Sequence, residues 1–219
     1  MIAPGVLAQQ ALLAGGVPTW VRPQRVANRQ AAANGAALAV PLPVGWVPGQ
    51  LCVMAIAASD TDAISIAGWT AAGGVVIGSG VRLYTLYRVL ESGDSFTIPS
   101  GGRRVAMCVT FAPGTFSTVS PIGSSTGSSA TPSVGLSGVD FEVGEHYQLH
   151  FVGTNGTGVF PITGPYADIN TGSGTGTTTL TFALGSGGQF NGGFSPSSSF
   201  SVSTSVNWAS VKVVIRGYY

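Results

Sequence analysis

A possible serine nucleophile lies in GSSTG, residues 123–127, which matches the G-x-S-x-G pattern of serine hydrolases. Ser125 would be the nucleophile. Asp140, followed by His146 or His150, would complete a triad in the order that α/β-hydrolases use. That chemistry needs a strand, a sharp turn and a helix to expose the serine. Here the serine stands in the tract STVSPIGSSTGSSATPS, which predicts a loop or an edge strand. We therefore expect Ser125 not to be catalytic and the protein not to be an enzyme.

The two histidines, His146 and His150, have the i, i+4 spacing of a zinc-binding helix. In that motif a glutamate follows the first histidine, whereas Glu145 precedes His146 here. The segment YQLHFVG has the composition of a strand, on which both histidines and Gln148 share one face. Glu145 would point to the other face. We expect a histidine pair that is hydrogen-bonded or exposed, and no metal site.

Two further segments could bind an ion or a phosphate. Asp60 and Asp62 form a D-x-D pair at the end of a predicted strand, but Ca²⁺ takes six to eight oxygen ligands. Turn-forming aspartates explain the pair equally well, so a turn is the favoured interpretation and a metal ion the open alternative. The run GSGTG, residues 172–176, resembles a phosphate-binding loop but lacks the lysine that follows such a loop. No cofactor is expected.

Four tryptophans lie near Gly or Pro turns or at the starts of predicted strands: Trp20, Trp46, Trp69 and Trp208. Solvent-facing indoles on the rim of a β-sandwich can hold sugar rings by stacking on their apolar faces. Burial in a core is the commoner fate of a tryptophan. The sequence leaves both interpretations open.

Three of the 9 basic residues gather near the N-terminus, at Arg22, Arg25 and Arg29. The stretch PQRVANRQAAANG could form a short helix with Pro23 in its first turn and Gly35 closing it. The spacing of the arginines would then place them along one face. They could form a solvated face, or belong to an N-terminal arm over residues 1–36, partly helical or extended, that contacts a neighbouring subunit.

The composition excludes several classes of function. Charged residues make up 8% of the chain, against about 25% in typical globular domains, and the net charge is +1. This charge offers no attraction for nucleic acid. No apolar run approaches the roughly 20 residues that span a bilayer, and no signal peptide is evident at the start. Cys52 and Cys108 stand in apolar surroundings and are expected to be buried thiols, not a disulfide.

From residue 37 the chain reads as strand after strand, separated by turns rich in its 33 glycines and 13 prolines. Gly-Ser-Gly at residues 78–80 predicts a hairpin between GGVVIGSG and VRLYTLYRV. In VRLYTLYRV, Leu83 and Tyr87 should share one face and Tyr84 and Leu86 the other. We predict an all-β fold: one jelly-roll-like two-sheet antiparallel sandwich over residues 37–219, preceded by the arm.

One ordered set of motifs spans residues 44 to about 114. It contains Gly68-Trp69-Thr70, Leu86-Tyr87-Arg88-Val89 and Gly93-Asp94, and it resembles jelly-roll-like modules in structural proteins of tailed bacteriophages. Those proteins are minor tail, fibre-like and head-decorating proteins. The chain departs from their pattern at Pro48-Gly49-Gln50-Leu51, where an acidic residue is lost.

The resemblance implies a virion setting and a structural role without a reaction. The expected function is a non-enzymatic component of a phage virion, on the tail or the head, that forms a homo-oligomer and contacts other virion proteins. In that setting a surface poor in charge would be covered by subunit contacts. The alternative is a host-attachment or carbohydrate-binding module on the virion surface, whose partner would be a host glycan.

Overall fold

The computed structural model describes residues 21–59, 63–73, 75–130, 133–134, 146–156, 162–163, 168–173, 178–185, 198–200 and 205–218. These residues form strands and turns. The described residues contain no helix, and hence no helix long and apolar enough to cross a membrane. The fold is therefore all-β across the described residues, as the sequence predicts.

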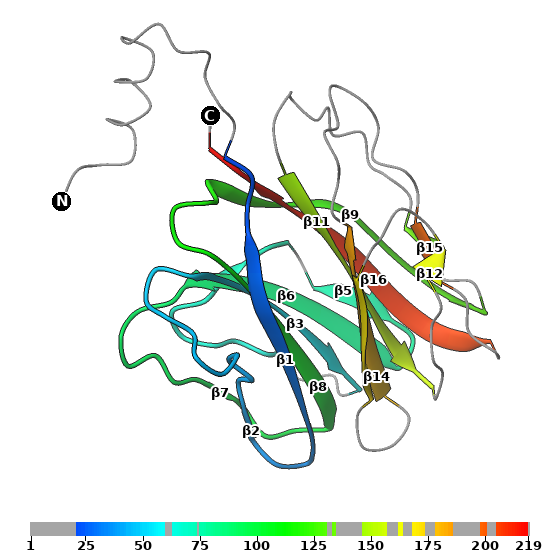
Figure 1. Cartoon of the computed structure of the whole chain (residues 1–219). Coiled ribbons are helices and arrows are strands. Elements are labelled where there is room, and N and C mark those ends of the chain that lie inside the picture. Colours follow the sequence, from blue (N-terminus) through cyan, green and yellow to red (C-terminus); the bar gives the residue numbers. More distant parts are fainter. Residues whose placement is uncertain are drawn as a thin grey trace, which may run out of the picture.

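Two antiparallel sheets make up most of the molecule (Figure 1). Sheet I has six strands, in the order β1 (Arg25–Asn34), β8 (Arg103–Phe111), β3 (Leu51–Ala58), β6 (Val81–Val89) and β4 (Thr70–Ala71), with β5 (Val76–Gly78) also paired to β6. Sheet II has five strands, in the order β13 (Asp168–Ser173), β14 (Thr178–Gly185), β11 (His146–Asn155), β16 (Val206–Arg216) and β9 (Thr118–Ser129).

Two small sheets accompany them. One pairs β2 (Leu38–Ala39) with β7 (Thr97–Ile98). The other has the order β10 (Ser133–Val134), β15 (Ser198–Phe200) and β12 (Ile162–Thr163).

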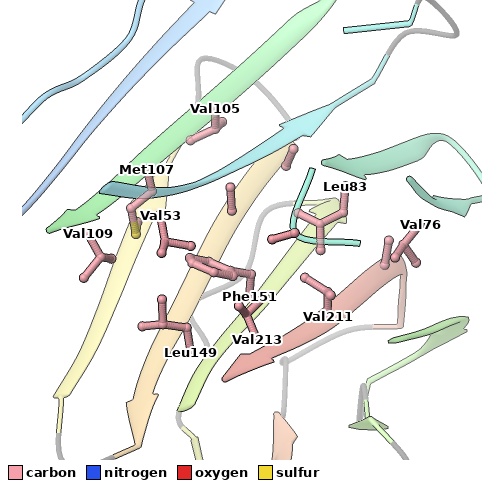
Figure 2. Close-up of a cluster of buried hydrophobic side chains, with 14 of the residues drawn as sticks. Val53, Val76, Leu83, Val105, Met107, Val109, Leu149, Phe151, Val211 and Val213 are labelled. Atoms are coloured by element: carbon pink, nitrogen blue, oxygen red, sulfur yellow. The ribbon is translucent and has the colours of Figure 1, made fainter. Parts of the chain in front are cut away.

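Sheets I and II share a buried apolar core, which we call the inner core (Figure 2). Alternate residues of each strand point into it, as the two-residue period of a strand requires. Sheet I contributes, among others, Val53, Leu83, Val105, Met107 and Val109. Sheet II contributes Leu149, Phe151, Val211 and Val213, among others. The arrangement is sandwich-like, with the core between the sheets.

The two sheets approach each other closely where β11 faces β3. A Cβ atom at Gly153 would lie 2.9 Å from the Cβ of Ala57 and 3.4 Å from a methyl carbon of Val81. A side chain at position 153 would therefore meet Ala57 across the core, and glycine lets β11 lie close to β3 at this point.

The outer face of sheet I is buried as well, under the loops that carry β2 and β7. Cys52, Met54 and Ile56 of β3 point to this side, together with Tyr84 and Leu86 of β6. We call this second cluster the outer core. Because β3 lies between both cores, all eight of its residues are buried. Cys52 and Cys108 lie in the outer core as free, buried thiols, which confirms their prediction.

Local predictions agree well with this structure. β5 and β6 pair through Gly78 and Val81, so the predicted hairpin is confirmed with Ser79 and Gly80 as its loop. Gly80 has a φ of 70°, the left-handed conformation that such a tight turn favours. The predicted division of β6 into two faces is also confirmed, because Leu83 lies in the inner core and Leu86 in the outer.

Of the two conformations predicted for the N-terminal stretch, the helix over residues 23–35 is wrong and the extended one is found, because residues 25–34 form strand β1. This strand pairs with β8 along its length. Ala32 packs against the inner core, while Ala31 and Ala33 pack against the outer core. Pairing and packing at both faces of a sheet outweigh the helix propensity of an alanine-rich segment.

The described strands do not establish the connectivity of a jelly roll. Sheet I draws its strands from residues 25–111, and sheet II from residues 118–216. The described part of the predicted arm contains β1 and is therefore part of sheet I. Val21 forms a bridge with Tyr218, so that the chain enters β1 beside the end of β16. Residues 1–20 lie outside the described residues.

Candidate functional site

The motif residues that carry the phage resemblance meet at one place in the structure, which we call the Arg88 corner. Arg88 of β6 donates hydrogen bonds from Nε and Nη2 to the two carboxylate oxygens of Asp94, at 2.9 and 3.1 Å. Its Nη1 donates to the carbonyl of Gly68 at 2.9 Å. One guanidinium group therefore joins the Gly68-Trp69-Thr70 corner to the Gly93-Asp94 turn.

Glycine is required on both sides of this corner. Gly68 has a φ of 79°, and a Cβ there would lie 2.8 Å from Nη1 of Arg88. Gly93 has a φ of 83° in the turn where the backbone N–H of Asp94 donates to the carbonyl of Glu91. These glycines allow the backbone to close around the arginine.

The ion pair is electrostatically strong. Its hydrogen bonds with Arg88 hold the pKa of Asp94 below its ordinary value, helped by the backbone N–H of Glu91. Asp94 in turn raises the pKa of Arg88. The guanidinium also lies 5.1 Å above the ring of Phe96, which meets Trp69 edge-on at 5.5 Å. The corner therefore combines an ion pair, a cation–π contact and an aromatic pair.

Next to the corner lies a hollow of about 310 Å³ on the outer side of sheet I. We call it the Trp46 hollow. Its lining comes from three separated segments: Arg29 of β1, the residues 39, 40 and 42–46 around a tight turn, and the residues 94–96 that follow the Arg88 corner. The aromatic side chains in its lining are Trp46 and Phe96.

The turn that carries Trp46 has a local cause. The backbone N–H of Trp46 donates to the carbonyl of Pro43 at 3.3 Å, and Gly45 has a φ of 76°. These features are typical of a type II turn, which needs glycine at its third position. Trp46 is half-buried and packs partly against the outer core, so its indole is held in place by the fold.

The three arginines do not share one face. A β-bulge between Arg25 and Ala27 shifts the register, so Arg25 lies opposite Phe111 and Arg29 opposite Cys108. Phe111 belongs to the inner core and Cys108 to the outer core, which places the two arginines on opposite faces of sheet I. Arg22 lies elsewhere, over the ring of Tyr147 at 4.9 Å. Their predicted alignment along a helix is therefore wrong.

The remaining tryptophans differ from Trp46. Trp208 is buried in β16, its Nε1 donates to Oγ of Ser129 at 3.1 Å, and its indole lies against Gly127. That position does not suit a solvent-facing platform. Trp69 is half-buried by its contact with Phe96. Trp20 lies outside the described residues, as do Asp60 and Asp62.

Ser125 lies within β9, an edge strand of sheet II, opposite Ser210 of β16. The edge-strand interpretation of this serine-rich tract is therefore confirmed. Ser125 is followed by four more strand residues, through Ser129, and not by the sharp turn of a nucleophile elbow. Asp140 lies outside the described residues.

The histidines lie on β11, as predicted, and both are buried with Gln148 between them. His150 lies opposite Lys212 of β16, which is buried too. Burial lowers the pKa of Lys212 to about 8, and burial with the charge of Lys212 holds the pKa of His150 well below its ordinary value. Glu145 lies outside the described residues. Within the described residues no group of three or more potential metal ligands forms.

Sequence reasoning did not find the Trp46 hollow or the burial of Lys212. The hollow combines residues 29, 46 and 94–96, whose proximity depends on pairing between distant strands. A signal for Lys212 was present, because it stands in the run ASVKVVI, in which Ser210 is the only other polar residue. Comparison of the chain with protein-family models, curated proteins and solved structures found no match.

Proposed function

We propose that the protein is a non-enzymatic structural component of a tailed bacteriophage virion, displayed on the tail or the head. The observation that supports this most is the Arg88 corner. Three residues from the motifs that resemble phage structural modules, Gly68, Arg88 and Asp94, are joined there by hydrogen bonds. In this proposal the sandwich has jelly-roll-like connectivity. Of the predicted arm over residues 1–36, the part before β1 contacts neighbouring subunits of a homo-oligomer, because residues 25–34 belong to sheet I.

The surface around β1 is suited to such subunit contacts. β1 is an edge strand of sheet I, and Val21 and Val26 are 41% and 51% exposed. Arginine is one of the residues that are enriched in protein interfaces. Arg22, Arg25 and Arg29 lie along this same stretch and would contact the neighbouring subunit or other virion proteins.

The test must leave β1 in place, because removing this strand would expose parts of the inner core and of the outer core. We would therefore delete residues 1–20 alone and, separately, replace Arg25 by glutamine, which leaves Arg22 over the Tyr147 ring and Arg29 in the Trp46 hollow unchanged. The proposal expects that either change prevents incorporation of the protein into particles while thermal unfolding stays as in the native protein. Normal assembly of both variants would contradict the arm.

A second candidate function is attachment to a glycan on the host surface, and the Trp46 hollow favours it. Trp46 is half-buried and lies beside hydrogen-bonding side chains, an arrangement that can hold a sugar ring by stacking. Particles that carry Trp46→Ala should then adsorb to host cells more slowly. Ile77→Ala is the matched control, because Ile77 is 60% exposed but lies on β5, outside the lining of the hollow.

A further inference from the structure

We propose that the Trp46 hollow binds a saccharide that carries a carboxylate. The inference rests on the second candidate function, attachment to a glycan, and names the chemical class of the ligand. Three observations lead to it: the aromatic side chains, the charge balance and the size of the hollow.

The aromatic side chains supply a stacking surface. Trp46 is fixed on one side by the outer core and is partly open on the other. Phe96 is fixed by Arg88 and Trp69. Because both rings are held before a ligand arrives, little conformational entropy is lost when a sugar ring stacks on them.

The charge balance at the hollow favours an anion. Asp94 lines the hollow, but both of its carboxylate oxygens accept hydrogen bonds from Arg88. Arg29 is exposed, and its one hydrogen bond within the described residues runs from Nη1 to the carbonyl of Leu42 at 3.2 Å. Its Nε and Nη2 therefore retain donors for a carboxylate, the group that a guanidinium binds in bidentate geometry.

The size of the hollow suits a small polar ligand. A volume of about 310 Å³ lies at the lower end of the roughly 300–1,000 Å³ usual for small-molecule sites. Ser95 adds a hydroxyl group to the lining and is exposed. One sugar residue of a longer chain could therefore stack on the rings and place its carboxylate at Arg29.

The test compares two sugars that differ only in this group, methyl β-D-glucuronide and methyl β-D-glucoside. Titration of the native protein, followed by ligand-detected NMR, should show tighter binding of the glucuronide by about tenfold, the usual effect of one charge-assisted hydrogen bond. Arg29→Gln should remove this preference. Arg25→Gln should keep it, because the bulge places Arg25 on the opposite face of the same strand.

Trp46→Ala should abolish the binding of both sugars while the unfolding transition stays cooperative. Equal binding of the two sugars by the native protein would overturn the inference, as would a preference that survives Arg29→Gln. Adsorption of particles to host cells tests attachment separately from the preference for a carboxylate. If Trp46→Ala slows adsorption and Arg29→Gln does not, attachment stands and the acidic ligand is refuted. If neither change slows adsorption, attachment itself fails.

Discussion

Replacing Arg88 by alanine removes the guanidinium group that joins the Gly68-Trp69-Thr70 corner to the Gly93-Asp94 turn. The contacts of this group determine how much the free energy of unfolding should fall. The side chains of Arg88 and Asp94 are only 18% and 10% exposed, so their two hydrogen bonds should contribute about 1.5 kcal/mol each. The bond to the carbonyl of Gly68 adds about 1 kcal/mol. The contact with Glu91, whose side chain is 76% exposed, adds almost nothing.

Ordering the long arginine side chain offsets about 1 kcal/mol of this stabilisation. We therefore expect Arg88→Ala to lower the free energy of unfolding by about 3 kcal/mol. Urea unfolding followed by tryptophan fluorescence would show this as a midpoint lower by roughly 1 M. Arg88→Lys should lose about 2 kcal/mol, because lysine keeps the charge but cannot bond both carboxylate oxygens.

A double-mutant cycle with Asp94→Asn isolates the ion pair. We expect a coupling energy of about 1–3 kcal/mol between the two positions. Arg82→Ala is the matched control, because Arg82 lies on the same strand and face and should cost less than about 0.5 kcal/mol. A coupling below about 0.5 kcal/mol, or an equal loss in Arg82→Ala, would refute the reasoning.

Three other predictions concern pH and packing. The pKa of Asp94 lies below its ordinary value of 3.8. The stability that the ionised carboxylate contributes is therefore complete above pH 3.8 and is lost as the pH falls through the lowered pKa. Asp94→Asn should lack this loss of stability in acid unfolding. The pKa of Lys212 falls from 10.5 to about 8, so the native state binds fewer protons between these values than the unfolded state. Lys212 should therefore contribute a rise of up to about 3 kcal/mol in the free energy of unfolding across this range, measured as the difference between the native protein and Lys212→Met, because the raised pKa of Cys108 acts in the opposite direction in its upper part. Gly153→Ala should cost about 1–3 kcal/mol in urea unfolding, because its Cβ would lie 2.9 Å from Ala57, and Ala57→Gly should recover part of the loss.

Short-range features of the fold could be read from the sequence. The hairpin at Ser79-Gly80 depends on four neighbouring residues, and the two faces of β6 follow from a period of two. The buried thiols Cys52 and Cys108 could be inferred because each stands within a continuous apolar run. These features depend on local backbone geometry and composition, which a sequence contains directly.

The tertiary structure alone decided the features that depend on distant partners. Residues 25–34 form a strand because β8, about 80 residues later, offers backbone groups to pair with. The bulge in that pairing, and not the spacing of the arginines, places Arg25 and Arg29 on opposite faces. Trp46 and Trp208 look alike in the sequence, but only the second is covered on both sides. Burial and charge at each site are set by what packs against it, and those neighbours come from parts of the chain that only folding brings together.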